Sequence, residues 1–177
     1  MFDPQPGSPF KWGRGAGISA FLEGNTVLRD QINDALKEAM KAKNERAVST
    51  LRMVNSSLKN ADIEARGAGK GPLGDAEVLA LLQKMIKQRQ ESVALYEQGG
   101  RADLVRQEQE EIAIISAYLP KQMSEPEMKA AIEAAVKETG AAGMKDMGKV
   151  IGILRSKYAG QMDMARASAM VKAQLAG

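Results

Sequence analysis

Hydrophobic side chains recur along residues 28–119 at the three- or four-residue spacing of amphipathic helices. Before a glycine-rich segment at 67–74, the hydrophobic positions are Leu28, Ile32, Leu36, Met40, Val48, Leu51, Val54 and Leu58. After it, on either side of a Gly-Gly break, they are Val78, Leu79, Leu82, Met85, Ile86, Val93, Tyr96, Leu104, Val105, Ile112, Ile115, Tyr118 and Leu119. This pattern predicts four helices that pack as two antiparallel pairs.

A second unit is predicted to begin at Pro120, because the residue before a proline is displaced from helical geometry. Ser124 and Glu127 then have the spacing of a capping box, with Pro126 in the first turn of a new helix. Further hydrophobic positions at helical spacing are Met128, Ile132, Val136, Met147, Val150, Ile151, Leu154, Ala167, Met170 and Val171. We therefore expect an all-α protein with a four-helix N-terminal lobe at 27–119 and a small three-helix C-terminal lobe at 120–177.

Two segments fall outside the helical pattern. Residues 1–26 contain three prolines and scattered glycines without a sustained hydrophobic period, which predicts a disordered leader. The glycine-rich segment at 67–74 resembles a phosphate-binding loop only superficially, because Lys70 is not followed by Ser or Thr. We expect it to be a mobile connector.

Three aspartates stand just before predicted helices. Asp75, Asp146 and Asp163 are each expected to accept hydrogen bonds from the first-turn amides of the helix that follows. Such a cap contributes about 1 kcal/mol.

Charged residues also interrupt the predicted helices at 76–119. Lys84, Lys87 and Arg89 are interpreted as a solvated face, with a ligand site as the alternative. The acidic side chains that follow are expected to be exposed or to pair with Arg106; they are Glu108, Glu110 and Glu111.

Composition narrows the possible chemistry, because the chain contains no histidine and no cysteine. It therefore has no imidazole base or ligand, no thiolate nucleophile and no disulfide. We expect no catalytic residue, no metal and no cofactor. No hydrophobic run approaches the roughly 20 residues of a membrane span, so no membrane partner is expected. The lack of cysteine is consistent with a cytoplasmic protein.

The predicted helix that starts near Met147 contains two glycines, Gly148 and Gly152. Each lowers helix stability by about 1 kcal/mol relative to alanine, so their lack of a side chain should serve a purpose. They share one face, where either another helix packs closely or the backbone of a ligand approaches.

Cationic side chains gather in the same part of the chain. From Asp146 onward there are five basic and two acidic residues, an excess of +3 that equals the formal net charge of the whole chain. Such a group is typical of phosphate contacts, and the lack of interleaved aromatics favours recognition of RNA by shape and backbone. The candidate RNA-binding residues are Lys145, Lys149, Arg155, Lys157, Arg166 and Lys172.

Several short motifs also carry a family resemblance. They are KQRQES at 87–92, GGRADL at 99–104, YLPKQM at 118–123 and MGKVIG at 147–152. From about Val27 to its end the chain resembles the YqeY family, small bacterial proteins similar to the C-terminal part of GatB, the tRNA-holding subunit of the tRNA-dependent amidotransferase. The resemblance implies tRNA or a tRNA-handling enzyme as the partner, with contacts around 147–152. Such chains normally begin with Met near this point, so Val27 is a candidate start.

Taken together, these patterns predict a non-catalytic helical protein that binds tRNA or associates with the amidotransferase. The resemblance points to carbon–nitrogen ligase activity with glutamine as the amido-N donor. The catalytic cradle of GatB has no counterpart here, however, so activity is not expected of the chain alone. Two alternatives remain open: an adaptor that binds a protein and no RNA, and an accessory factor that needs the other amidotransferase subunits.

Overall fold

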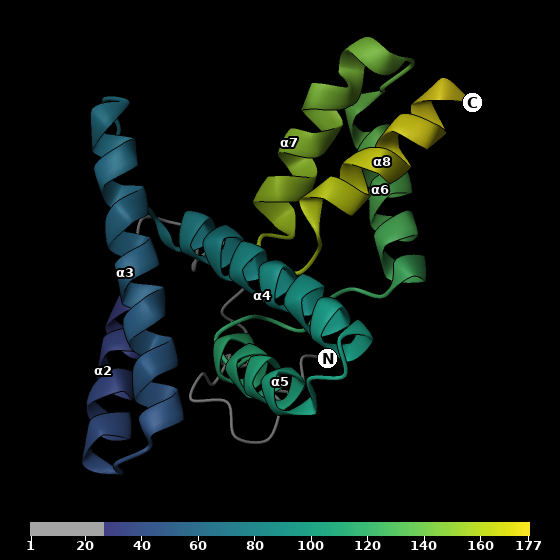
Figure 1. Ribbon diagram of the computed structural model, residues 1–177. Helices are drawn as coiled ribbons and strands as arrows, with labels where there is room; N and C mark the ends of the chain where they lie inside the picture. Colours follow the sequence, from purple (N-terminus) through teal and green to yellow (C-terminus); the bar gives the residue numbers. More distant parts are fainter. Residues whose placement is uncertain (1–26) are drawn as a thin grey trace.

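A computed structural model describes residues 27–177, and the predicted leader at 1–26 lies outside the described residues. This described part contains seven α-helices, one short 3₁₀ helix and no strand, so the all-α expectation is confirmed for it (Figure 1). The elements are α2 (Val27–Lys41), α3 (Glu45–Gly67), α4 (Asp75–Gln98), α5 (Ala102–Ser116), α6 (Glu125–Thr139), η1 (Met144–Asp146), α7 (Met147–Lys157) and α8 (Met164–Ala176).

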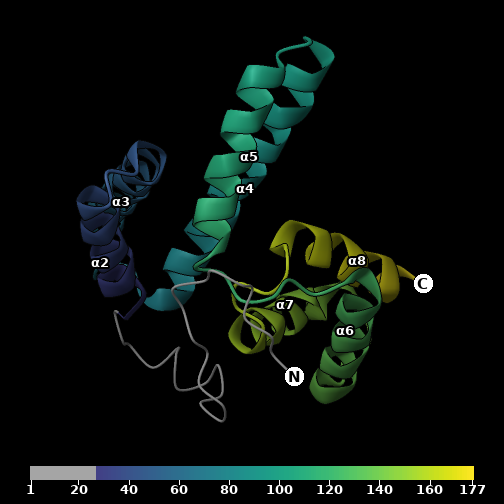
Figure 2. The same cartoon turned by 90° about the horizontal axis from the view of Figure 1, so that it is seen from below.

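The first four helices form two hairpins. α2 packs against α3 and α4 packs against α5, as both views of the molecule show (Figure 2). Asn44 caps α3, with its side-chain oxygen accepting a hydrogen bond from the Ala47 amide at 3.1 Å. At the other hairpin Gly100 has a φ of 67°, a left-handed conformation that glycine adopts without steric cost. The break predicted there is therefore confirmed.

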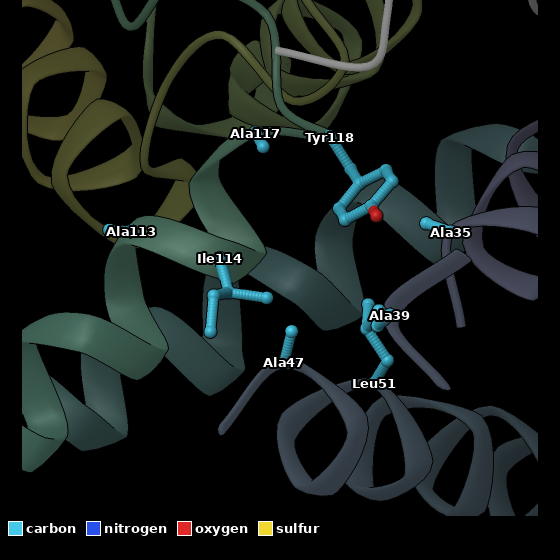
Figure 3. Close-up of a pocket in the computed structure, with 8 residues that line it drawn as sticks. All are labelled: Ala35, Ala39, Ala47, Leu51, Ala113, Ile114, Ala117 and Tyr118. Atoms are coloured by element: carbon cyan, nitrogen blue, oxygen red, sulfur yellow. The ribbon is translucent and has the colours of Figure 1, made fainter. Parts of the chain in front are cut away.

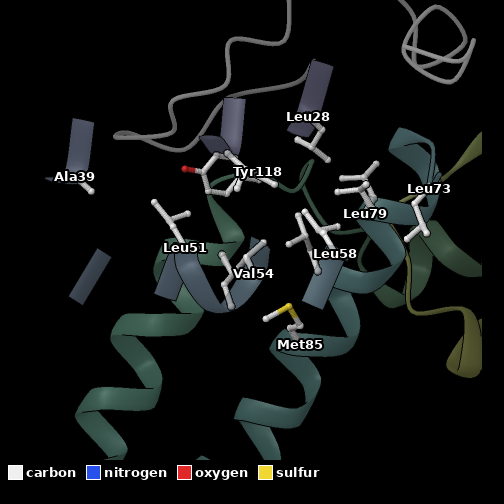
Figure 4. Packing of buried hydrophobic residues seen from close by; sticks show 13 residues of the cluster. Leu28, Ala39, Leu51, Val54, Leu58, Leu73, Leu79, Met85 and Tyr118 are labelled. Atoms are coloured by element: carbon white, nitrogen blue, oxygen red, sulfur yellow. The ribbon is translucent and has the colours of Figure 1, made fainter. Parts of the chain in front are cut away.

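One hydrophobic cluster joins the two hairpins (Figure 4). Its fully buried members are Leu28, Ile32, Val54, Val78, Leu79, Leu82 and Ile115. They come from all four helices, and all seven occupy positions that helical spacing predicts. Met40 was expected to face inward as well, but 45% of it is exposed at the end of the first hairpin.

A second hydrophobic cluster lies among α6, α7 and α8 and shares no residue with the first. Its most deeply buried members are Ile132, Val150, Leu154, Met162, Ala167 and Val171. The helices thus fall into two groups by the cluster to which they contribute. That the groups behave as two separate domains stays a prediction.

The segment between α7 and α8 lies against α4. Gln83 of α4 donates a hydrogen bond to the Met162 carbonyl at 3.1 Å. Gln122, in the loop between α5 and α6, donates one to the Gly160 carbonyl at 2.6 Å. Gly160 itself is buried against Leu79. These contacts connect the second group of helices to the first.

Two of the predicted helix caps are confirmed. Asp163 accepts a hydrogen bond from the Ala165 amide at 2.8 Å, at the start of α8. The capping box of α6 is complete, since Ser124 accepts from the Glu127 amide at 3.4 Å and Glu127 accepts from the Ser124 amide at 2.7 Å.

The other two caps were assigned wrongly. The Asp75 carboxylate accepts a hydrogen bond from the Leu28 amide, so it caps α2 and not its own helix. Asp146 stands at the start of α7, but its carboxylate accepts from the Ala142 amide at 3.1 Å, in the preceding loop. In both cases the three-dimensional fold brings a different unpaired amide within reach.

The solvated face predicted on α4 is correct only in part. Lys84 and Lys87 are exposed, whereas Arg89 is buried and its Nε lies 3.0 Å from a carboxylate oxygen of Glu111. Glu111 is also buried, which corrects the expectation of an exposed or Arg106-paired side chain. Arg46 approaches the same carboxylate at 3.8 Å. Buried charges need partners of this kind, and here they hold α3, α4 and α5 together.

Candidate functional site

The six candidate cations all lie on the surface of the second group of helices. Three are on α7 and two on α8, while Lys145 belongs to η1, which contacts both helices. All six are exposed, as a phosphate-contacting surface requires.

Three of these cations are already engaged with carboxylates. Lys149 lies 3.6 Å from Asp146, and Lys157 forms an ion pair with Glu138 of α6. Arg166 pairs with Glu125, at the start of α6. The hydrogen bond to Glu138 also raises the pKa of Lys157, because the carboxylate favours the charged ammonium.

The other three candidate cations form no ion pair and are here called uncompensated, although the hydrogen bond from the Ala142 amide and, more weakly, the charge of Lys145 lower the pKa of Asp146. Lys145, Arg155 and Lys172 have no ion pair with any residue in 27–177. Among the six candidates, these three side chains therefore have a charge that no ion pair neutralises.

Gly148 and Gly152 lie on an exposed part of α7. A Cβ atom built at either position would meet nothing within 4 Å among the described residues. A close helix crossing inside this part of the chain is thus not the reason for these glycines. An approach by a binding partner is the alternative that remains from the sequence.

The net charge of the chain is confined to this second group. Residues 27–119 carry 14 basic and 14 acidic side chains, whereas residues 120–177 carry nine basic and six acidic ones. The first group is therefore formally neutral and the second has a charge of +3, which matches the expectation of a basic C-terminal part.

A polar cluster at the start of α2 could not be found from sequence spacing. Arg29 makes two hydrogen bonds to Asp62 of α3, at 2.6 and 2.8 Å, and the Leu73 amide donates to the same carboxylate at 3.0 Å. These contacts hold the pKa of Asp62 below its ordinary value. Burial raises the pKa of the neighbouring Asp75, although the Leu28 amide partly opposes this. The cluster ties α2, α3 and α4 together.

A small hydrophobic pocket opens between α5 and the hairpin of α2 and α3 (Figure 3). It is lined by Ala35, Ala39, Ala47, Leu51, Ala113, Ile114, Ala117 and Tyr118. Its one titratable group is Tyr118, whose pKa is raised to about 12 by burial. This lining offers no group that exchanges protons near neutral pH, so the pocket is not a candidate for acid–base catalysis.

Residues 27–177 contain neither a metal-binding cluster nor a membrane-spanning helix. No group of three or more acidic side chains is arranged to hold a metal ion. None of the described helices is both long and hydrophobic enough to cross a membrane.

Curated relatives are found among fungal proteins. The chain is 35% identical over 109 residues to "Altered inheritance of mitochondria protein 41, mitochondrial" of Lachancea thermotolerans, a match that covers 60% of this chain and 57% of the relative. The protein of the same name from Pyrenophora tritici-repentis is 28% identical over 138 residues, which cover 76% of this chain and 73% of the relative. The chain spans little more than half the length of the first of these relatives.

These relatives are named as mitochondrial proteins, and this contradicts the expectation of a cytoplasmic protein. That expectation rested on the absence of cysteine, which a mitochondrial protein can equally show.

The family itself is identified by a match that spans most of the described helices. The profile of the family described as Yqey-like protein matches residues 29–175, from the first turn of α2 to the last turn of α8. The chain therefore belongs to the Yqey-like protein family.

Proposed function

We propose that this chain is a non-catalytic RNA-binding protein that contacts tRNA through η1, α7 and α8. The observation that carries the proposal is the separation of charge, with a neutral first group of helices and a charge of +3 on the second. Uncompensated cations supply the counterion-release term that dominates the affinity of proteins for nucleic acids.

The exposed surface of α7 is suited to contact with the sugar–phosphate backbone of RNA. Arg155 follows Gly148 by seven residues, about two helical turns, so both lie on the same side of the helix as Gly152. The two glycines leave the helix backbone uncovered, and the guanidinium stands at the end of this strip. Arginine binds phosphate through paired hydrogen bonds, which fits recognition of RNA by its backbone.

The test is fluorescence anisotropy of labelled tRNA at several salt concentrations. One variant replaces the uncompensated cations, Lys145, Arg155 and Lys172, with glutamine. The control replaces the paired cations, Lys149, Lys157 and Arg166, with glutamine and so removes the same amount of charge, from α7 and α8. We expect the first variant to lose more affinity and to flatten the salt dependence by about two to three units of logarithmic slope, because each lost phosphate contact removes about one.

Equal losses in the two variants would show that only bulk charge matters and that the surface is not specific. Absence of binding by the wild-type chain at low salt would rule out the RNA function.

A protein partner is the second candidate, and one observation favours it. Met144 of η1 is 45% exposed, so a large hydrophobic side chain lies on the surface just before α7 begins. For an adaptor, the change Met144→Ser would weaken the complex more than loss of Arg155, whereas an RNA binder would show the opposite order.

A further inference from the structure

The outward side of α3 carries a regular row of cations, far along the chain from α7. Arg52, Lys59 and Arg66, here called the α3 basic stripe, are all exposed. They are spaced seven residues apart, about two helical turns or 10 Å, so they lie on one side of the helix. The stripe is therefore about 21 Å long, at 1.5 Å per residue.

The side chains that lie in line with these cations on the same side of α3 are not acidic, although Asp62 and Glu64 stand between Lys59 and Arg66 in the sequence. Ser56 and Ile63 lie on the same side of the helix, and both are exposed, Ile63 to 59%. The buried side of α3 points the other way and carries Leu51, Val54 and Leu58. The stripe thus lies on a different side of α3 from these core residues, and Arg52 contacts α2 through the sulfur of Met40.

The neighbouring helix offers a comparison, because two of its exposed lysines are paired within the helix. On α2, Lys37 pairs with Asp34 at 3.2 Å and Lys41 pairs with Glu38 at 2.7 Å, each with the carboxylate three residues earlier. No cation of the α3 basic stripe has an ion pair with any residue from Val27 to Gly177.

One carboxylate is close enough in sequence to neutralise the stripe, but it is already engaged. Asp62 is three residues from Lys59 and four from Arg66. Both of its oxygens accept hydrogen bonds from Arg29, and the Leu73 amide donates to one of them. Arg29 of α2 therefore balances most of the charge of Asp62, while Arg66 attracts the carboxylate more weakly and forms no ion pair with it.

We propose that the α3 basic stripe is a second RNA-binding surface, which contacts the phosphate backbone of a duplex segment. RNA as the partner rests on the proposed function, and the α3 site itself rests on its uncompensated charge. Arginine and lysine are the side chains that bind phosphate oxygens, and three of them in a rigid row match a regular series of phosphates. α3 contains no aromatic residue on which unpaired bases could stack, so a duplex fits better than a single strand.

The experiment uses the full chain and two variants of equal charge. The stripe variant combines Arg52→Gln, Lys59→Gln and Arg66→Gln. The control combines Lys37→Gln, Lys41→Gln and Lys43→Gln on the first helix and its turn. Binding to a labelled RNA duplex and to tRNA is measured over a salt series. We expect the stripe variant to bind the duplex at least about tenfold more weakly, with a logarithmic salt slope smaller by about two to three, and the control to stay close to wild type.

The outcomes separate this inference from the proposed function. If the variant of Lys145, Arg155 and Lys172 loses RNA affinity and the stripe variant does not, the proposed function stands and the stripe is not a binding surface. If only the stripe variant loses affinity, α3 is the RNA site and the surface on α7 and α8 is not. Vesicles that contain phosphatidylserine provide the last comparison: a stripe variant that loses vesicle binding but keeps RNA binding would overturn the inference in favour of an anionic membrane.

Discussion

Gly160 and Leu79 approach each other so closely that no side chain could stand at position 160. A Cβ atom at this residue would lie 2.9 Å from Cδ1 and 3.1 Å from Cβ of Leu79. The φ of Gly160 is 73°, which L-residues rarely adopt. This contact sets the distance between the segment that precedes α8 and the middle of the first hydrophobic cluster.

The substitution Gly160→Ala should therefore lower the free energy of unfolding by about 2 kcal/mol, through overpacking and backbone strain together. Chemical denaturation measures this change. Unaltered stability would mean that the segment can move away from α4 without cost, and that Gly160 does not fix the junction.

Gly148 and Gly152 should behave in the opposite way. Alanine at these positions meets nothing within 4 Å, so each change should raise the free energy of unfolding by about 1 kcal/mol through helix propensity. If a partner approaches the backbone of α7, the same variants should bind tRNA more weakly although they are more stable. Denaturation and anisotropy on the same samples check both parts. Higher stability with unchanged binding would remove the two glycines from the proposed site.

The comparison of these glycines shows where sequence reasoning succeeds and where it stops. A glycine inside a predicted helix attracts notice because it weakens the helix, and this drew attention to Gly148 and Gly152. Gly160 stands in a loop, where glycine is ordinary, and its tight contact is with Leu79 of α4, which is far away in the chain. The destabilising effect of a glycine on its own helix can be inferred from a sequence, whereas a contact between distant segments cannot.

Helix positions and caps show the same limit. The Ser124 box and the Asp163 cap use amides within three residues, so spacing alone predicted them. Asp75 caps a helix whose amide is 47 residues away, which no local pattern indicates. For Arg89 the signal was present, because it follows Met85 by four residues on the hydrophobic side of α4. The ion pairs of the candidate cations across helices were not predicted either.

The buried pair of Arg89 and Glu111 gives a prediction of its own. Removing one partner, as in Glu111→Leu, should lower the free energy of unfolding by about 3–5 kcal/mol, because the remaining charge is buried without its partner. The double change of both residues to leucine should recover most of this loss. A double-mutant cycle from denaturation curves measures the coupling. A double variant no more stable than the single one would show that the pair is needed for the fold and not merely for charge balance.

The fold should tolerate loss of the negative charge at position 75, but not loss of the side-chain oxygen that caps α2. Asp75→Ala removes the cap on α2 and should lower the free energy of unfolding by about 1 kcal/mol, whereas Asp75→Asn keeps an acceptor for the Leu28 amide. Burial raises the pKa of Asp75 in the folded state, so ionisation weakens the fold as the pH rises through that pKa. Asp75→Asn should therefore equal or exceed wild type in stability at neutral pH and lose any advantage in acid. An asparagine variant as unstable as the alanine variant at pH 7 would contradict this explanation.

Asp62 should make the protein sensitive to acid. Its hydrogen bonds to Arg29 and to the Leu73 amide hold its folded-state pKa below the ordinary 3.8. A group whose pKa is lowered by folding stabilises the protein above its ordinary pKa, and this contribution is lost as the pH falls through the folded-state value. Asp62→Asn removes the charge at every pH, so its melting temperature should be lower than that of wild type at pH 7. The difference should shrink as the pH falls below about 4, where the wild-type carboxylate also becomes protonated. Thermal unfolding of both proteins across this pH range measures the difference. A difference that stays constant down to the lowest pH would show that the ion pair between α2 and α3 does not contribute through the charge of Asp62.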